Sequence, residues 1–127
     1  MKKYLISILI LALLLPGCAA KAENAVYRQI SMEDAMDVMA ERTDYLILDV
    51  RTQEEFASGH IPGAIVISHE KIKEQAESQL PDKDQLILVY CRSGRRSKLA
   101  AQDLVDLGYT NVKEFGGIID WPYEVVQ

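Results

Sequence analysis

The chain has 127 residues, of which 49% are hydrophobic and 26% are charged, and its formal net charge at pH 7 is -5. This length is enough for one domain with a hydrophobic core, and the composition is that of an ordinary globular protein. Nucleic-acid-binding domains usually carry a basic surface, which an acidic chain does not supply. We therefore expect no nucleic-acid partner.

The first residues have the pattern of an export signal. Lys2 and Lys3 precede a largely apolar run over residues 5–15, and small residues follow it. The run is too short to cross a membrane, which needs about 20 residues, and the combination is typical of a secretory signal peptide. We predict a signal peptide over residues 1–17.

Two cleavage sites compete at the end of this segment. The stretch Leu15-Pro16-Gly17-Cys18 resembles the lipobox of bacterial lipoproteins, although proline stands where a small residue is usual. The resemblance implies that Cys18 carries acyl chains such as palmitate, with residues 18–27 as the tether of an exported protein. It would then lie at the outer face of the cell membrane or in the periplasm. The alternative is ordinary cleavage after Ala22, within a small-x-small pattern.

The first half of the domain alternates between helical and extended patterns. Ser31 begins a helix with apolar residues at helical spacing, and Thr52 with Glu55 forms a capping box that opens a second, short helix. Short apolar runs predict strands over 45–48, ending at Asp49, and over 64–67.

The second half continues the alternation. Residues 69–79 have a weak helical period, 86–90 read as a buried strand, and 95–107 as an amphipathic helix that Gly108 ends. A last strand is predicted at 112–115, before Gly116 and Gly117 open a closing turn or short helix. Apolar runs separated by helices indicate an α/β protein with a parallel sheet covered on both faces.

The stretch Y-C-R-S-G-R-R-S at 90–97 follows a buried strand and opens a helix. Ligands of such sheets bind at the carboxyl ends of the strands, where Asp49, Cys91 and Gly116 all fall. Backbone N–H groups and arginines near a helix start stabilise a thiolate, which is the nucleophilic form of cysteine. Cys91 is also the single free thiol that either cleavage would leave, so no internal disulfide is expected.

The side chains around Cys91 suit an anionic substrate. Gly94 permits the left-handed turn that closes the loop on the sulfur, and Ser93 can donate a hydroxyl hydrogen. Guanidinium groups bind anions in a bidentate manner, which makes Arg92, Arg95 and Arg96 candidate substrate-binding residues.

These residues resemble the active-site loop of the rhodanese family of sulfurtransferases. Two more stretches match the family, from Leu48 through the G-H-I-P-G-A segment at 59–64, and G-G-I-I-D-W at 116–121. The resemblance covers residues 28–127. It implies a rhodanese-like domain with a five-stranded parallel sheet, helices on both faces, and neither a metal nor another cofactor.

The resemblance also implies roles for individual residues. Cys91 would take a sulfane sulfur from thiosulfate or a related persulfide donor, and pass it to cyanide or a thiol. The backbone amides of 92–96 would surround the persulfide, with Arg92 and Arg96 holding the sulfonate end of the donor. Asp49 and Arg51 would support the loop. We expect His60 to be structural, His69 to be exposed and Trp121 to pack near the rim of the site.

Other functions remain open at this point. A rhodanese module can bind a partner without catalysis, and a persulfide-forming thiol can serve a redox relay with a second protein. A phosphatase or arsenate reductase of the same fold is disfavoured, because its loop is C-x5-R and Ser97 stands where that arginine would fall. The expected ligands are small molecules and, through the lipid, the membrane; we expect a monomer.

Overall fold

The computed structural model describes residues 26–127. The predicted signal peptide, Cys18 and the alternative cleavage site after Ala22 lie outside the described residues. Within residues 26–127, no helix combines the length and the apolar character that a membrane span requires.

A five-stranded sheet forms the centre of the domain, and all its strands are parallel. The spatial order is β1-β5-β4-β2-β3, so β2 and β4 lie side by side near the middle. The bounds are β1 (Arg28–Gln29), β2 (Tyr45–Asp49), β3 (Ile65–Val66), β4 (Leu86–Cys91) and β5 (Val112–Gly117). The predicted α/β fold with a five-stranded parallel sheet is confirmed.

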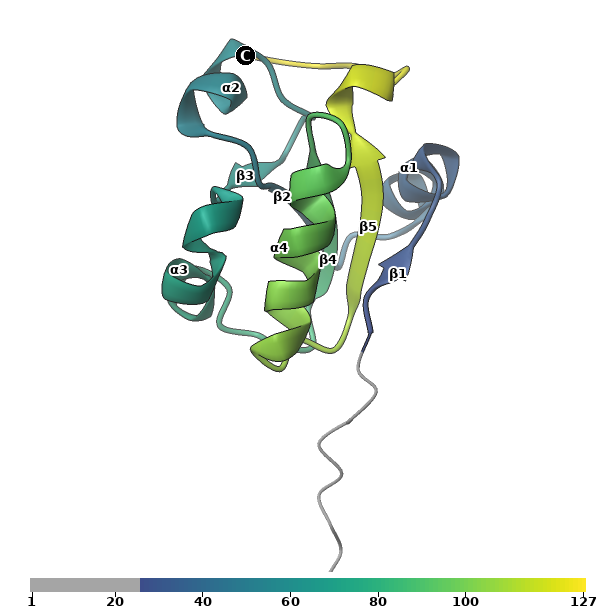
Figure 1. Cartoon of the computed structure of the whole chain (residues 1–127). Helices are drawn as coiled ribbons and strands as arrows, with labels where there is room; N and C mark the ends of the chain where they lie inside the picture. The colour runs from purple at the N-terminus through teal and green to yellow at the C-terminus, as the bar shows by residue number, and fades with distance from the viewer. Residues whose placement is uncertain (1–25) are drawn as a thin grey trace, which may run out of the picture.

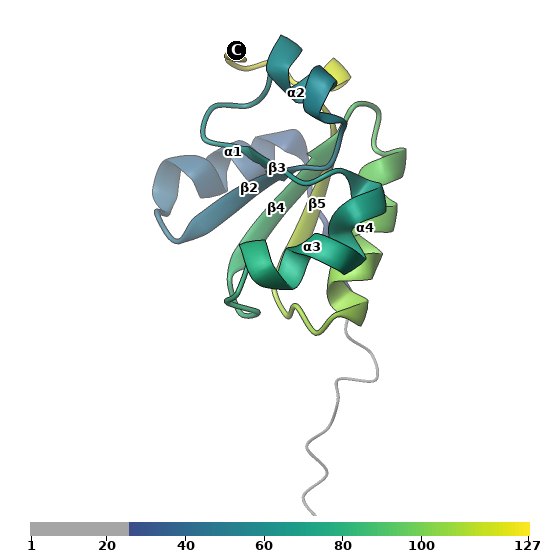
Figure 2. The ribbon, with the colours of Figure 1, turned by 90° about the vertical axis from the view of Figure 1, so that its left-hand side faces the viewer.

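Helices cover both faces of the sheet. Helices α3 and α4 pack on one face and α1 on the other, as the two views of the ribbon show (Figures 1 and 2). The bounds are α1 (Met32–Glu41), α2 (Gln53–Ser58), α3 (Ile72–Gln79) and α4 (Arg95–Asp106), with 3-10 turns η1 (His69–Lys71) and η2 (Ile118–Asp120). Each predicted helix is present, including the weakly patterned one at 69–79.

Local sequence explains where the first helices begin. Ser31 accepts a hydrogen bond from the backbone N–H of Asp34 at 2.9 Å, which satisfies a donor at the start of α1. Thr52 and Glu55 form the predicted capping box at the start of α2, with each side chain bonded to the backbone of the other residue.

Two hydrophobic layers separate the helices from the sheet. One joins α3 and α4 to the sheet and includes Leu104 and Val89; the other lies under α1 and includes Ala35 and Phe115. Every residue of β4 is buried, as expected of a central parallel strand covered on both sides. The last residue of that strand is Cys91, so the core fixes the position of the cysteine.

Candidate active site

The loop after β4 wraps its backbone around the Cys91 sulfur. Gly94 has φ 100° and forms the N-cap of α4, a left-handed conformation that residues with a Cβ rarely adopt. From this position its N–H donates a hydrogen bond to Cys91 Sγ at 3.0 Å. Cys91 itself is fully buried. The loop thus directs a backbone donor at the sulfur, at the positive end of a helix.

Strand β5 holds the loop from the other side. Its pairing with β4 shifts between Val89 and Cys91, which places Gly117 beside Cys91. A Cβ on Gly117 would overlap the carbonyl oxygen of Arg92, so only glycine permits this close approach. The same carbonyl accepts a hydrogen bond from the Ile119 N–H at 3.1 Å. The G-G-I-I stretch at 116–119 therefore fixes the backbone of the cysteine loop.

A buried carboxylate lies one hydroxyl group away from the sulfur. The Cys91 S–H is placed to donate to Ser97 Oγ at 3.3 Å, and that hydroxyl donates to Glu114 Oε1 at 2.7 Å. Glu114 is only 2% exposed and also accepts the Gly116 N–H at 2.8 Å. Glu114 was not among the predicted site residues. A signal in the sequence was available, because residues two apart in a strand face the same side of the sheet. Glu114 follows the apolar Val112 by two positions in β5, so this alternation places a charged residue on a covered face.

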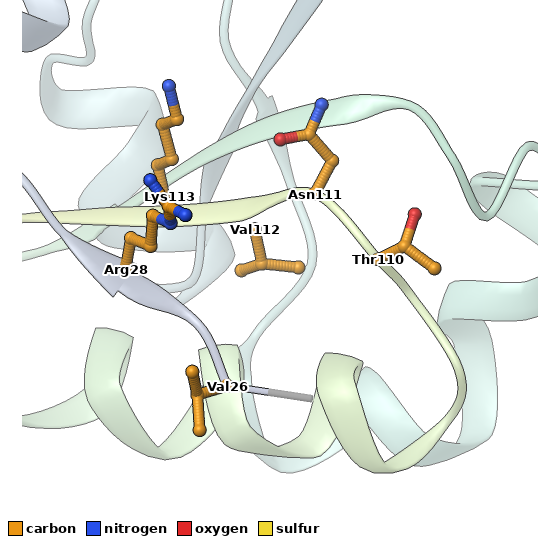
Figure 3. Close-up of a pocket in the computed structure, with 6 residues that line it drawn as sticks. All are labelled: Val26, Arg28, Thr110, Asn111, Val112 and Lys113. Atoms are coloured by element: carbon orange, nitrogen blue, oxygen red, sulfur yellow. The ribbon is translucent and has the colours of Figure 1, made fainter. Parts of the chain in front are cut away.

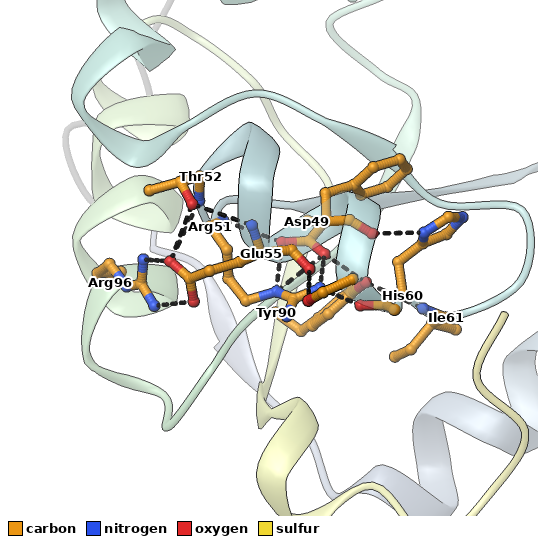
Figure 4. A network of polar contacts seen from close by, with 11 residues as sticks. Asp49, Arg51, Thr52, Glu55, His60, Ile61, Tyr90 and Arg96 are labelled. Atoms are coloured by element: carbon orange, nitrogen blue, oxygen red, sulfur yellow. Dashed lines mark hydrogen bonds and ion pairs between the residues drawn. The ribbon is translucent and has the colours of Figure 1, made fainter. Parts of the chain in front are cut away.

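The three arginines of the loop differ in their surroundings. Arg92 and Arg95 are exposed, and neither forms an ion pair with another residue in 26–127. Arg96 is half-buried, and its Nη1 and Nη2 donate to the two carboxylate oxygens of Glu55 at 2.6 and 2.9 Å (Figure 4). The pair joins the start of α4 to α2. Glu55 was predicted only as a capping residue, and its second role was missed.

This pairing shifts both groups toward their charged forms. The hydrogen bond from Arg96 is the main cause that lowers the pKa of Glu55 to about 2, against the opposing effect of burial. The pKa of Arg96 is raised, first by its hydrogen bond to Glu55 and further by the negative charges of Glu55, Cys91 and Asp49. The Arg96 guanidinium is therefore near the cysteine, but much of its charge is neutralised by Glu55.

Glu55→Gln should destabilise the domain by about 1–2 kcal/mol at neutral pH, after allowance for partial exposure of the pair. Glutamine also serves in a capping box, so the substitution isolates the charge. Because the pKa of Glu55 is lowered on folding, its contribution is present above about pH 4.5 and is lost as the pH falls toward 2. Urea unfolding of both proteins across this range should give curves that converge at low pH. The matched control is Glu54→Gln, and a constant difference at all pH values would contradict the account.

The buried pair of Asp49 and Arg51 supports the residue before the cysteine (Figure 4). Arg51 Nη2 lies 2.6 Å from Asp49 Oδ2, and Tyr90 donates its hydroxyl to the same carboxylate oxygen at 2.7 Å. Burial lowers the pKa of Arg51, but the hydrogen bond and charge of Asp49 outweigh it and leave the pKa raised. Burial also raises the pKa of the Tyr90 hydroxyl, which keeps it protonated as a donor.

The same network holds the turn at residues 59–61. Arg51 Nη2 donates to the Gly59 carbonyl at 2.7 Å, and the Tyr90 hydroxyl accepts the Ile61 N–H at 3.1 Å. The residues predicted as loop supports therefore connect β2, the turn and the end of β4. Tyr90 was predicted only as a strand residue, and the role of its hydroxyl was missed; it is the direct link to Cys91.

The histidines and the tryptophan lie outside the cysteine loop. His60 stacks on Phe56 with 3.7 Å between ring centroids, and its Nδ1 lies 2.8 Å from the Phe56 carbonyl oxygen. Trp121 is buried against Phe115. The expectation that His69 is exposed is wrong: the residue is half-buried, and its Nδ1 is buried without a hydrogen-bond partner. The His69 N–H donates to the Val50 carbonyl at 2.9 Å, and this contact holds the start of η1 against the segment that follows β2.

Two hollows in residues 26–127 are lined by residues outside the Cys91 loop. One of about 250 Å³ lies at the amino end of β5, and Val26, Arg28 and Lys113 are among its lining residues (Figure 3). Another of about 220 Å³ opens on the α1 side and includes Met36, Met39 and Trp121. Across residues 26–127, no group of His, Cys, Asp and Glu side chains is arranged to hold a metal ion.

Comparison with known proteins identifies the family. The family model for the rhodanese-like domain matches residues 31–122. The chain belongs to the rhodanese-like domain family. The matched range includes Cys91, Asp49 and Gly116-Gly117.

Individual relatives agree with this membership. The thiosulfate sulfurtransferase PspE of Escherichia coli (strain K12) is 40% identical over 73 residues, covering 58% of this chain and 70% of the relative. The thiosulfate sulfurtransferase GlpE of Coxiella burnetii (strain RSA 493 / Nine Mile phase I) is 37% identical over 97 residues, covering 76% and 88%. A solved structure described as rhodanese with anions from E. coli has a TM-score of 0.61 at 36% identity, covering 65% of this chain and 98% of that one.

Proposed function

We propose that this rhodanese-family protein is a sulfurtransferase that moves a sulfane sulfur from thiosulfate, or a related persulfide donor, to cyanide or a thiol. The observation that carries the proposal is the Cys91 sulfur, which sits in a backbone loop and accepts the Gly94 N–H at 3.0 Å. Similarity to sulfurtransferases named for thiosulfate supports the choice of donor.

The first half-reaction forms a persulfide on Cys91. The thiolate attacks the outer sulfur of thiosulfate, a new S–S bond forms, the bond to the sulfonate sulfur breaks, and sulfite leaves with the electron pair. In the second half-reaction the acceptor attacks the outer sulfur of the persulfide and regenerates the Cys91 thiolate. The Gly94 N–H, already directed at Sγ, stabilises negative charge on sulfur throughout.

The three loop arginines differ in how they can interact with the donor. Because Cys91 is fully buried, the residues that cover it must move before a donor sulfur reaches Sγ. Arg92 and Arg95 are exposed beside it and attract the dianion. Arg96, predicted to hold the sulfonate, does so only if the donor competes with Glu55 for its nitrogens. We therefore place the main binding role on Arg92 and Arg95.

Steady-state kinetics test the proposal against the alternatives. Thiocyanate formation from thiosulfate and cyanide should follow ping-pong kinetics, because sulfite leaves before cyanide reacts. A binding module would form no thiocyanate. A redox relay would instead reduce or form a disulfide with a partner protein and would not consume thiosulfate.

We further propose that Cys18 is lipidated and anchors the exported protein at the outer face of the cell membrane or in the periplasm. The lipobox-like stretch supports this, and two or more acyl chains give stable attachment. In a bacterial host, wild-type protein should fractionate with membranes and Cys18→Ser should not. A soluble wild-type protein beginning at Glu23 would show cleavage after Ala22 instead.

A further inference from the structure

We propose that Glu114 accepts the proton of the Cys91 thiol through the hydroxyl of Ser97, so that the reactive thiolate forms without a second buried negative charge. The three groups form a continuous hydrogen-bonded chain, with contacts of 3.3 Å and 2.7 Å on either side of Ser97 Oγ. Glu114 acts through another residue and is therefore a positioning residue. The inference rests on the proposed role of Cys91 as the nucleophile.

Glu114 is an unusual group to find at this position. It is 2% exposed, and none of the lysines, arginines or histidines in residues 26–127 forms an ion pair with it. A buried carboxylate without a cation is costly unless it is strongly hydrogen-bonded or protonated. Its hydrogen-bond donors are the Ser97 hydroxyl and the Gly116 N–H, both on the same oxygen, Oε1.

The Ser97 hydroxyl couples the cysteine to the carboxylate because it has only one hydrogen. That hydrogen points to Glu114 Oε1 at 2.7 Å or to the Gly94 carbonyl at 3.1 Å while Cys91 donates its own S–H to Oγ. A thiolate at Cys91 would need the Ser97 hydroxyl hydrogen as a donor. The Glu114 carboxylate would then lose that donor and keep only the Gly116 N–H. Two adjacent anions would then share too few donors.

Moving the proton along the chain removes this conflict. The S–H proton passes to Ser97 Oγ, and the former hydroxyl proton passes to Glu114 Oε1. The resulting carboxylic acid donates to Ser97 Oγ, whose hydroxyl now donates to the thiolate beside the Gly94 N–H. The thiolate then has two donors, because the Ser97 hydroxyl joins the Gly94 N–H. Both hydrogen bonds of Ser97 are reversed in direction, and the net charge of the three groups stays at one negative unit.

The other charged groups around the cysteine do not substitute for Glu114. Four of them form two ion pairs, one at the end of β2 and one between α2 and the start of α4. The remaining two belong to the loop and are exposed to solvent. These groups are Asp49 with Arg51, Arg96 with Glu55, and the exposed Arg92 and Arg95. Among these groups, Glu114 is the one buried base that is connected to the sulfur.

The pH dependence of Cys91 alkylation tests the inference without any sulfur donor, so its result is independent of the proposed substrate. The full chain with Cys18→Ser leaves Cys91 as the single thiol. Neutral iodoacetamide is the probe, because its approach is not steered by charge. With Glu114 as the acceptor, the wild-type rate should change less than about twofold between pH 5.5 and 7, since the shared proton stays within the protein.

Glu114→Gln keeps an oxygen that accepts from Ser97 and Gly116, and loses only the ability to take the proton. Its alkylation rate should fall about tenfold for each unit by which the pH is lowered from 7 to 5.5, as for an isolated thiol. Ser97→Ala, which breaks the chain at its middle, should behave in the same way and serves as the second variant if Glu114→Gln does not fold. Glu41→Gln, an exposed carboxylate on α1, is the matched control and should follow the wild type.

A purely structural role for Glu114 gives a different result. The alkylation rate of the wild type would then fall about tenfold for each unit by which the pH is lowered, or would not be measurable at pH 6. Glu114→Gln would react at least as fast as the wild type, because a charge that repels the thiolate is gone. Either observation overturns the inference.

Discussion

Cys91→Ser should abolish sulfur transfer, with a loss in kcat on the order of 10⁶-fold, the scale on which loss of a catalytic nucleophile acts. A serine hydroxyl stays protonated at neutral pH and forms no persulfide. The fold should be retained, because serine can accept the Gly94 N–H and donate to Ser97 from the same buried position. Thiocyanate formation and thermal melting measure the two quantities on one sample.

Lys98→Ala is the matched control for this change. Lys98 is exposed on the same helix, one turn from the loop, and has no ion-pair partner in residues 26–127. Its activity should equal that of the wild type within a factor of about two. Residual transfer by Cys91→Ser above the rate of the uncatalysed reaction would show that another group carries the sulfur.

Asp49→Asn should lower the free energy of unfolding by about 3–5 kcal/mol, because it leaves the Arg51 guanidinium buried beside a neutral group. Tyr90 would also lose the carboxylate that accepts its hydroxyl. Since Tyr90 precedes Cys91, the remaining folded protein should have reduced activity as well. Urea unfolding at neutral pH measures the first effect.

The control for this substitution is Asp44→Asn, which removes the same charge from the solvent-exposed ion pair of Asp44 with Arg42. Its side chains also approach to 2.6 Å, but they are 66% and 45% exposed. Asp44→Asn should have little measurable effect, because water replaces the lost interaction. Equal losses for the two variants would contradict the claim that burial gives the Asp49 pair its importance.

The sequence was sufficient for those parts of the fold that local patterns specify. The apolar runs at 45–48 and 86–90 predicted β2 and β4, and the capping box at Thr52 predicted the start of α2. Strand β1 was missed because it has two exposed residues and is defined only by backbone pairing with β5. Backbone hydrogen bonds between strands do not depend on side-chain type, so two exposed residues leave no hydrophobic pattern in the sequence.

The candidate site shows the same division. Cys91 and the glycine-containing loop could be placed at the end of a strand, because neighbouring residues determine that geometry. The partner of Arg96 could not, since Glu55 is 41 residues away in the chain and already had a local explanation as a capping residue. Glu114 was overlooked because its importance depends on a contact with Ser97 across two elements.

The central claim is that Cys91 carries sulfur as a persulfide, and the intact mass of the protein tests it most directly. Reduced, folded protein should gain the mass of one sulfur atom when excess thiosulfate is added, and should lose it again when cyanide follows. Cys91→Ser should show neither change. An unchanged mass of the wild type in excess thiosulfate would contradict the account.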